Sequence, residues 1–161
     1  MNKIVSPEEA ANLSLQLRKE TKTIVLAGGC FDILHIGHVT FLQKAKEHGD
    51  ILIVLLESDA FIKNSKGENR PINTQSDRAH VLMAMTAVDY VLSLPDILKD
   101  SEYDKLILAL KPAIIATTKA DPTRIHKDRQ AKLCGASVVE VNELIQNQST
   151  THIAKLLQKE L

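Results

Sequence analysis

The chain has 161 residues, 44% hydrophobic and 25% charged, which fits one globular domain and excludes an intrinsically disordered chain. The 20 basic residues balance the 20 acidic ones, so the sequence lacks the basic excess of nucleic-acid-binding domains. No apolar run reaches the roughly 20 residues that span a bilayer, and the N-terminus leads into a charged helical pattern, so we expect neither membrane insertion nor a signal peptide. Two isolated cysteines, Cys30 and Cys134, favour reduced thiols and a cytoplasmic location.

The N-terminal segment predicts a helix that runs to about Glu20. Ser6 can cap its free amides, Pro7 suits its first position, and Glu9 can complete a capping box. We interpret residues 1–22 as an N-terminal helix extension of a single domain that spans residues 1–161. The apolar face of this helix could cover the sheet or meet a second subunit, so a homodimer remains open.

Downstream, short apolar segments alternate with amphipathic ones. The expected strands cover residues 23–27, 51–56, 90–94, 113–117 and 137–141. The expected helices cover residues 37–49, 59–64, 74–87, 101–110, 123–133 and 149–157, with Thr74 as an N-cap and Gly49 and Gly135 as C-caps. Strands joined by helix-length connections pair in parallel. We therefore predict an α/β fold, a single doubly wound Rossmann-like domain with a five-stranded parallel sheet and ligands beyond the carboxyl ends of its strands.

The segment after the first long strand has features of a phosphate site. Gly28 and Gly29 end that strand, and His35 and His38 flank a glycine where a loop enters a helix. Glycine permits close backbone approach, a helix N-terminus attracts anions, and imidazoles can donate hydrogen bonds to phosphate. A zinc site would need further ligands, and neither an HExxH motif nor a cysteine pair is present, so we expect no metal site made by the protein.

The run from Gly28 to Asp32, followed by His35-Ile36-Gly37-His38, resembles the signature of the "HIGH"-motif nucleotidyltransferase superfamily, a motif also found in class I aminoacyl-tRNA synthetases. The resemblance covers about residues 23–157. It is strongest to the heptose-1-phosphate adenylyltransferase domain of ADP-heptose synthases. The residues that extend it are Asp50–Asp59, Lys63, Lys66-Gly67, Arg70-Pro71-Ile72-Asn73, Arg78, Val88-Asp89 and Ser149-Thr150-Thr151.

This resemblance implies roles for individual residues. The catalytic residues would be His35, His38 and Lys63. Nucleotide binding would involve Gly29, Cys30, Phe31, Asp32, Gly37, Arg78, Ser149, Thr150 and Thr151, and substrate binding would involve Asp32, Lys63 and Arg70. Several alternatives stay open: Asp32 could orient a histidine or stabilise the turn, Lys66 could replace Lys63 although a solvated lysine is preferred there, and Ser149–Thr151 could simply cap a helix.

The resemblance also implies an activity. We expect transfer of AMP from ATP to a phosphorylated small molecule such as a heptose 1-phosphate, with release of pyrophosphate, in lipopolysaccharide or nucleotide-sugar biosynthesis. Mg²⁺ would accompany the nucleoside triphosphate and be held by few protein ligands. Neither a nucleic acid nor a membrane is expected as a partner.

One segment departs from the family pattern. Residues 116–122 read Ala-Thr-Thr-Lys-Ala-Asp-Pro where the heptose enzymes carry K-G-G-D-Y, a region used for nucleotide and substrate contacts. A CTP-dependent cytidylyltransferase acting on glycerol 3-phosphate or a similar polyol phosphate is therefore an alternative. An adenylyltransferase for a flavin-type phosphate and a catalytically weak nucleotide-binding sensor are further ones.

Overall fold

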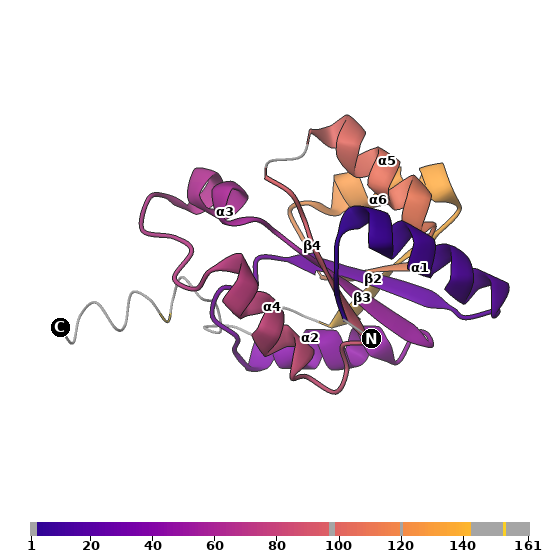
Figure 1. The fold of residues 1–161 in the computed structure, drawn as a ribbon, viewed down its shortest axis with the longest axis horizontal. Coiled ribbons are helices and arrows are strands. Elements are labelled where there is room, and N and C mark those ends of the chain that lie inside the picture. Colours follow the sequence, from indigo (N-terminus) through magenta and orange to yellow (C-terminus); the bar gives the residue numbers. More distant parts are fainter. Residues whose placement is uncertain (1–2, 97–98, 120, 143–152, 154–161) are drawn as a thin grey trace.

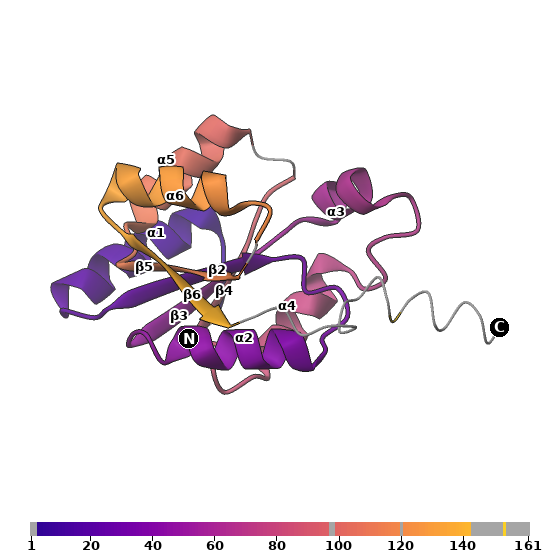
Figure 2. The same ribbon diagram turned by 180° about the vertical axis from the view of Figure 1, so that it is seen from behind.

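The computed structural model describes residues 3–96, 99–119, 121–142 and 153. Figures 1 and 2 show a central sheet between two layers of helices. The strands are β1 (Ile4–Val5), β2 (Ile24–Gly29), β3 (Ile51–Leu56), β4 (Tyr90–Ser93), β5 (Ile114–Thr118) and β6 (Ser137–Asn142). The helices are α1 (Pro7–Lys19), α2 (Ile36–Lys46), α3 (Asp59–Lys66), α4 (Gln75–Met83), α5 (Asp100–Leu110) and α6 (Arg124–Cys134).

All strand pairs are parallel, in the order β1-β4-β3-β2-β5-β6. The predicted parallel α/β sheet is confirmed, but it has six strands, and the expectation of five was wrong. The extra strand is β1, in which Ile4 and Val5 lie opposite Val91 and Leu92 of β4. Two apolar residues are too few to give a periodic pattern in the sequence. They form a strand because they pair with the backbone of β4. The expected N-terminal helix extension therefore also contributes to the sheet.

Each face of the sheet carries its own apolar core. Helices α1, α5 and α6 cover the face to which Leu26, Ile53 and Leu55 point. Helices α2 and α4 cover the opposite face, which holds Val25 and Val54. Neighbouring residues of one strand alternate between the two cores, as the geometry of a strand requires. Burial on both faces explains the unbroken apolar runs of β2 and β3.

Several helix ends agree with the sequence. Ser6 and Glu9 form the predicted capping box, Thr74 accepts a hydrogen bond from the amide of Asp77, and Gly135 ends α6 with a φ of 76°. Gly49 was wrongly predicted as a C-cap, because α2 ends earlier and its C-cap is Glu47. A Cβ on Gly49 would lie 2.7 Å from a Val25 methyl carbon and 2.8 Å from the Thr23 carbonyl oxygen, so a close approach to β2 excludes a side chain there.

The sheet opens at its centre. Strand β2 pairs with β3 over residues 24–29, but it pairs with β5 only at Val25 and Leu26. Among the described residues, the carboxyl-end half of β2 therefore has no strand partner on its β5 side. The chain also reverses direction across the sheet here, since β3 and β4 lie on one side of β2 and β5 and β6 on the other. Such a switch point is where open α/β sheets bind ligands.

Candidate functional site

The turn between β2 and α2 carries the two motif histidines. His35 is the N-cap residue of α2 in an extended conformation (φ −140°, ψ 172°), and His38 lies in the first turn of the helix. Their rings stack with centroids 3.8 Å apart, and the Phe31 ring lies 5.1 Å from that of His38. Gly29 makes room for Phe31, because a Cβ on Gly29 would be 3.0 Å from the Phe31 ring. The sequence motif thus becomes a compact pair of imidazoles at a helix N-terminus.

Both imidazoles favour the neutral form. Burial, the neighbouring His35 and the charge of Lys66 together lower the pKa of His38 to about 4. Burial also lowers the pKa of His35. The Nδ1 atom of each ring is buried without a hydrogen-bond partner among the described residues. An unpaired buried nitrogen is costly, so an incoming anion that raises the pKa of either ring would relieve the site.

Asp32 orients the turn. Its fully buried side chain accepts hydrogen bonds from the backbone amides of Ile72 and Asn73 at 2.9–3.0 Å and forms an ion pair with Arg70. The Asn73 side-chain amide donates to the Asp32 carbonyl oxygen at 2.7 Å. Burial alone would raise the pKa of Asp32, but these amides and Arg70 lower it. The carboxylate therefore fastens the loop after α3 to the histidine turn, and the stabilising role considered above fits this geometry.

Arg70 is held by one edge only. Its Nε atom donates to Asp32, and its side chain is 10% exposed. The Nη2 atom is buried and has no hydrogen-bond partner among the described residues. A guanidinium with an unpaired Nη2 donor is suited to bind a phosphate that reaches it. The structure thus brings Arg70 to the histidine turn, where its predicted contact with substrate remains a proposal.

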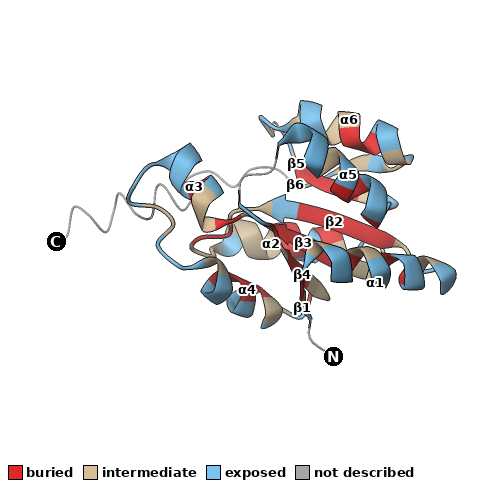
Figure 3. Cartoon of the chain, turned by 45° about the horizontal axis from the view of Figure 1, so that its top comes forward, coloured by how far each residue is buried: buried red, intermediate tan, exposed pale blue. Residues whose placement is uncertain are grey.

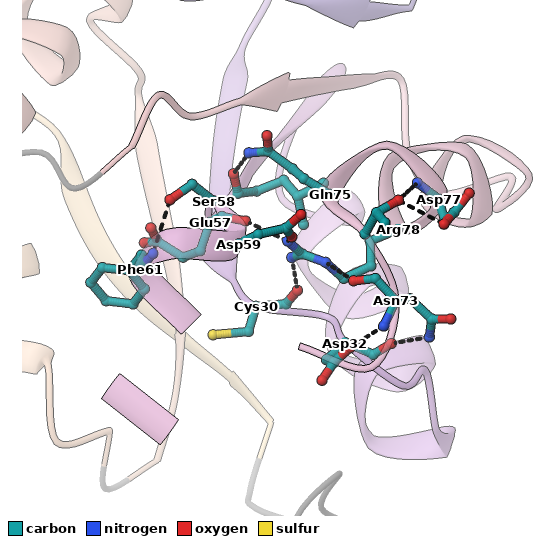
Figure 4. A network of polar contacts seen from close by, with 12 residues as sticks. Cys30, Asp32, Glu57, Ser58, Asp59, Phe61, Asn73, Gln75, Asp77 and Arg78 are labelled. Carbon is teal, nitrogen blue, oxygen red and sulfur yellow. Dashed lines mark hydrogen bonds and ion pairs between the residues drawn. The ribbon is translucent and has the colours of Figure 1, made fainter. Parts of the chain in front are cut away.

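Arg78 lies at the centre of a hydrogen-bond network (Figure 4). Its side chain donates to the carbonyl oxygens of Asn73 at 3.1 Å, Glu57 at 2.9 Å and Cys30, and to the Asp59 carboxylate at 2.7 Å. The residue is only 2% exposed. These bonds join the ends of β2 and β3 to α3 and α4. These hydrogen bonds all go to other residues of the protein, and they show that Arg78 holds neighbouring segments together. The predicted contact of Arg78 with a nucleotide stays a prediction.

The two lysines of α3 have different surroundings. Lys63 forms an ion pair with Glu68 at 2.8 Å, and both side chains are largely exposed. Burial raises the pKa of Cys30, and the positive charge of Lys66 opposes that effect. The same charge adds to the effect of burial in lowering the pKa of His38. Lys66 is exposed, as the solvated position that we preferred for it requires, and its charge nevertheless acts on His38. Only the phase of α3, which is not readable from sequence, separates the two.

In the segment that departs from the family pattern, the Asp121 carboxylate forms hydrogen bonds with nearby residues of the chain. The Asp121 carboxylate accepts hydrogen bonds from the Thr117 hydroxyl at 2.6 Å, from Lys127 at 2.6 Å and from the Thr123 backbone amide at 2.8 Å. Burial would raise the pKa of Asp121, but these donors lower it strongly. The loop after β5 is thus closed by its own side chains.

Ser149, Thr150 and Thr151, together with the expected helix 149–157, lie outside the described residues. Within the described ranges, no group of three or more His, Cys, Asp or Glu residues could hold a metal ion. No described helix is long and apolar enough to cross a membrane. The predicted residues that do come together are Gly29, Cys30, Phe31, Asp32, His35, Gly37, His38, Arg70 and Arg78.

A doubly wound parallel sheet with an HxGH pair at the N-terminus of the helix after β2 is the arrangement expected of a nucleotidyltransferase of the HIGH-motif class. Residues 26–154 match the model of the cytidylyltransferase-like family, and the chain belongs to this family.

Relatives and solved structures agree with this assignment. The bifunctional protein HldE of Nitratiruptor sp. is 52% identical over 67% of this chain and 22% of its own length. HldE of Wolinella succinogenes is 39% identical over 97% of this chain and 31% of its own length. The chain thus spans less than a third of either relative.

A lipopolysaccharide core biosynthesis protein from Thermoplasma volcanium matches 76% of this chain and 97% of its own, with 26% identity and a TM-score of 0.59. A pantoate-beta-alanine ligase from Francisella tularensis, 15% identical with a TM-score of 0.65, covers 98% of this chain with 77% of its own and supports the fold alone.

Proposed function

We propose that the protein transfers AMP from ATP to a sugar 1-phosphate of the heptose type and releases pyrophosphate. The observation that carries this proposal is the stacked His35–His38 pair at the N-terminus of α2, in which each buried Nδ1 atom has no hydrogen-bond partner among the described residues. Kinship with HldE proteins, and the resemblance to heptose-1-phosphate adenylyltransferase domains, support ATP and a sugar phosphate over other substrates.

The chemistry follows from the charges involved. A phosphate oxygen of the acceptor attacks the α-phosphorus of the nucleotide, a new P–O bond forms, and the bond to the β-phosphate oxygen breaks. The nucleophile is already ionised, so no strong general base is required. Phosphoryl-type transfer depends on positioning and on stabilising negative charge. His35, His38, the first amides of α2, Lys66 and Arg70 would supply the donors and positive charge.

Magnesium belongs to this proposal as a companion of the triphosphate. The Asp32 carboxylate is occupied by Arg70 and by two backbone amides, so it is not open to a cation in this arrangement. A Mg²⁺ bound through the phosphates and water fits these surroundings, because Mg²⁺ often keeps several waters and few protein ligands. When bound, the ion would neutralise charge on the triphosphate.

The other expectations remain part of the proposal. Gly29, Cys30, Phe31, Asp32 and Gly37 would shape the nucleotide site through the backbone of the turn, and Ser149–Thr151 would contact the triphosphate. Lys63, as a catalytic residue, and Arg78, as a nucleotide contact, stay predictions. A homodimer, a cytoplasmic location and a place in lipopolysaccharide biosynthesis are likewise proposed.

The test is pyrophosphate release by the full chain with Mg²⁺, ATP or CTP, and a panel of phosphorylated acceptors. We expect release with ATP and heptose 1-phosphate, and none when the acceptor is omitted. Release with CTP and glycerol 3-phosphate alone would replace the proposal by the cytidylyltransferase alternative. Calorimetric binding of ATP without release for any acceptor would instead identify a nucleotide sensor.

A further inference from the structure

A half-buried carboxylate lies at the carboxyl end of β3 and takes no part in the proposed phosphate chemistry. Glu57 directly follows β3, and its Oε1 atom accepts a hydrogen bond from the Tyr103 hydroxyl of α5 at 2.8 Å. Burial raises the pKa of Glu57, against the opposing effects of Tyr103 and Arg78. A carboxylate repels phosphate, so its position beside a phosphate site calls for a different ligand group.

The backbone next to Glu57 is open. Gly28 belongs to β2 at the centre of the sheet, yet it is exposed, and Figure 3 shows this end of β2 in pale blue beyond its buried part. A Cβ on Gly28 would meet nothing nearer than Leu55 atoms at 3.9 Å. Strand β5 pairs with β2 only before this point. We call the exposed space bordered by Gly28, Cys30 and Glu57 the Gly28 opening.

The side chains at the opening share one face of the sheet. Leu26 and Leu55 belong to the core under α1, α5 and α6, so strand alternation places Gly28 and Glu57 on that same face. The Cys30 thiol lies near as well. Burial is the main cause that raises the pKa of Cys30, and the charge of Glu57 raises it further. The pKa of Tyr103 is raised by burial first, and then by Glu57 and Cys30.

Two kinds of ligand group would meet at this place. Lys66 acts on His38 and on Cys30, so positive charge reaches the opening from the phosphate side. Glu57 offers hydrogen-bond acceptors from the β3 side, and its Oε1 is fixed by Tyr103. A ligand with a phosphate at one end and hydroxyl groups at the other matches this division, since hydroxyls donate well to a carboxylate.

We propose that Glu57, held in place by Tyr103, binds hydroxyl groups of a sugar that lies in the Gly28 opening. The identity of the sugar ligand rests on the proposed function, whereas its binding at Glu57 can be measured whether or not the reaction takes place. The hydroxyls can belong to the acceptor or to the ribose of the nucleotide, and the experiment separates these sources. Glu57 is a binding residue in this scheme, and Tyr103 is a positioning residue that acts through it.

Calorimetry on the full chain tests the binding without any need for turnover. The probes are heptose 1-phosphate, inorganic phosphate, ATP and 2′-deoxy-ATP, each with wild type, Glu57→Ala, Glu57→Gln and Tyr103→Phe. Glu8→Gln, an exposed carboxylate on α1, is the matched control. Circular dichroism melting of each variant shows that its fold is retained.

If the acceptor supplies the hydroxyls, Glu57→Ala weakens heptose 1-phosphate about tenfold and leaves inorganic phosphate unchanged, as for the loss of a hydrogen bond to a charged group. If the ribose supplies them, Glu57→Ala weakens ATP about tenfold, and 2′-deoxy-ATP binds both proteins equally. Tyr103→Phe gives a smaller loss for the same probe, and Glu57→Gln retains part of the affinity.

A second variant keeps the test independent of the carboxylate. Gly28→Val fills the opening, and we expect it to weaken binding of the same probe as Glu57→Ala does. The valine removes the space for the sugar, and the alanine removes its hydrogen-bond partner. Equal binding of all four probes by wild type and both variants, within about twofold, overturns the inference. Loss of pyrophosphate release alone, with these binding differences intact, would count against the proposed reaction and not against the sugar site.

Discussion

The turns after β2 and after β5 lie at the same edge of the sheet and each contains an aspartate, but the bonding of the two aspartates differs. In the β2 turn, Asp32 is paired with Arg70, while one nitrogen of Arg70 and one of each histidine have no partner among the described residues. In the β5 turn, Asp121 bonds to Thr117, Thr123 and Lys127 together. The unpaired buried nitrogens of the β2 turn agree with the ligand site proposed there, whereas the described residues of the β5 turn satisfy their own carboxylate.

The largest effect should come from His38→Ala. Removing one donor that stabilises transition-state charge typically costs about 10²–10³ in turnover. We expect that loss in pyrophosphate release, with a melting temperature close to that of wild type. The exposed His48→Ala serves as control. Turnover within about threefold of wild type in His38→Ala would remove the catalytic role from the β2 turn.

Arg78→Ala should lower the free energy of unfolding by about 3 kcal/mol, because it leaves the Asp59 carboxylate and three carbonyl oxygens without their partner. Urea denaturation measures this, with the exposed Lys63→Ala as control. Arg78→Lys should recover part of the loss. Wild-type stability combined with weak ATP binding would return Arg78 to the nucleotide site that the sequence predicted.

Acidification should weaken the fold through the β2 turn. The pKa of His38 is about 4 in the folded protein, below its ordinary value of 6.5, so the unfolded chain binds a proton first as the pH falls. This contribution is complete above pH 6.5 and is lost between 6.5 and about 4. From pH 7 to pH 5 it amounts to at most about 2 kcal/mol. His38→Asn should show a smaller drop in urea denaturation, and equal drops would contradict the burial of a neutral ring.

Lys66→Ala should lower kcat/KM about tenfold, which corresponds to about 1.4 kcal/mol, because its charge acts on His38. Lys63→Ala, on the same helix and paired with Glu68, should have the smaller effect. Steady-state assays of the two variants compare them directly. A larger loss in Lys63→Ala would restore the family-based assignment.

The smallest effect on binding is expected in the β5 turn. Asp121→Asn should leave the affinity for ATP within about twofold of wild type, because its carboxylate is used by Thr117, Thr123 and Lys127. Stability should fall by about 1 kcal/mol, the typical contribution of a hydrogen bond. Calorimetry and urea denaturation measure the two effects. A tenfold loss of ATP affinity would show that this turn also binds nucleotide.

Sequence reasoning succeeded where the signal is local. The apolar runs of β2 and β3, the Ser6–Glu9 capping box and the HxGH turn each depend on residues close together in the chain. Burial of Arg78 was not readable, since its partners Cys30 and Glu57 are 48 and 21 residues away. The choice between Lys63 and Lys66 likewise needs the rotation of α3 relative to His38. The role of Asp32 required a loop 40 residues later.

The two-residue strand β1 has a consequence for the behaviour of the protein at high concentration. An open strand edge is a template for pairing with another molecule. Ile4 and Val5 lie along β4, and the Val91 amide donates to the Lys3 carbonyl oxygen at 2.9 Å, so the edge of the longer strand is covered. On this side of the sheet the outer edge is then only two residues long, and the N-cap Ser6 and Pro7 of α1 follow it. The N-terminal segment thus protects the β4 side of the sheet from edge-to-edge pairing, whereas β6 forms the edge on the other side.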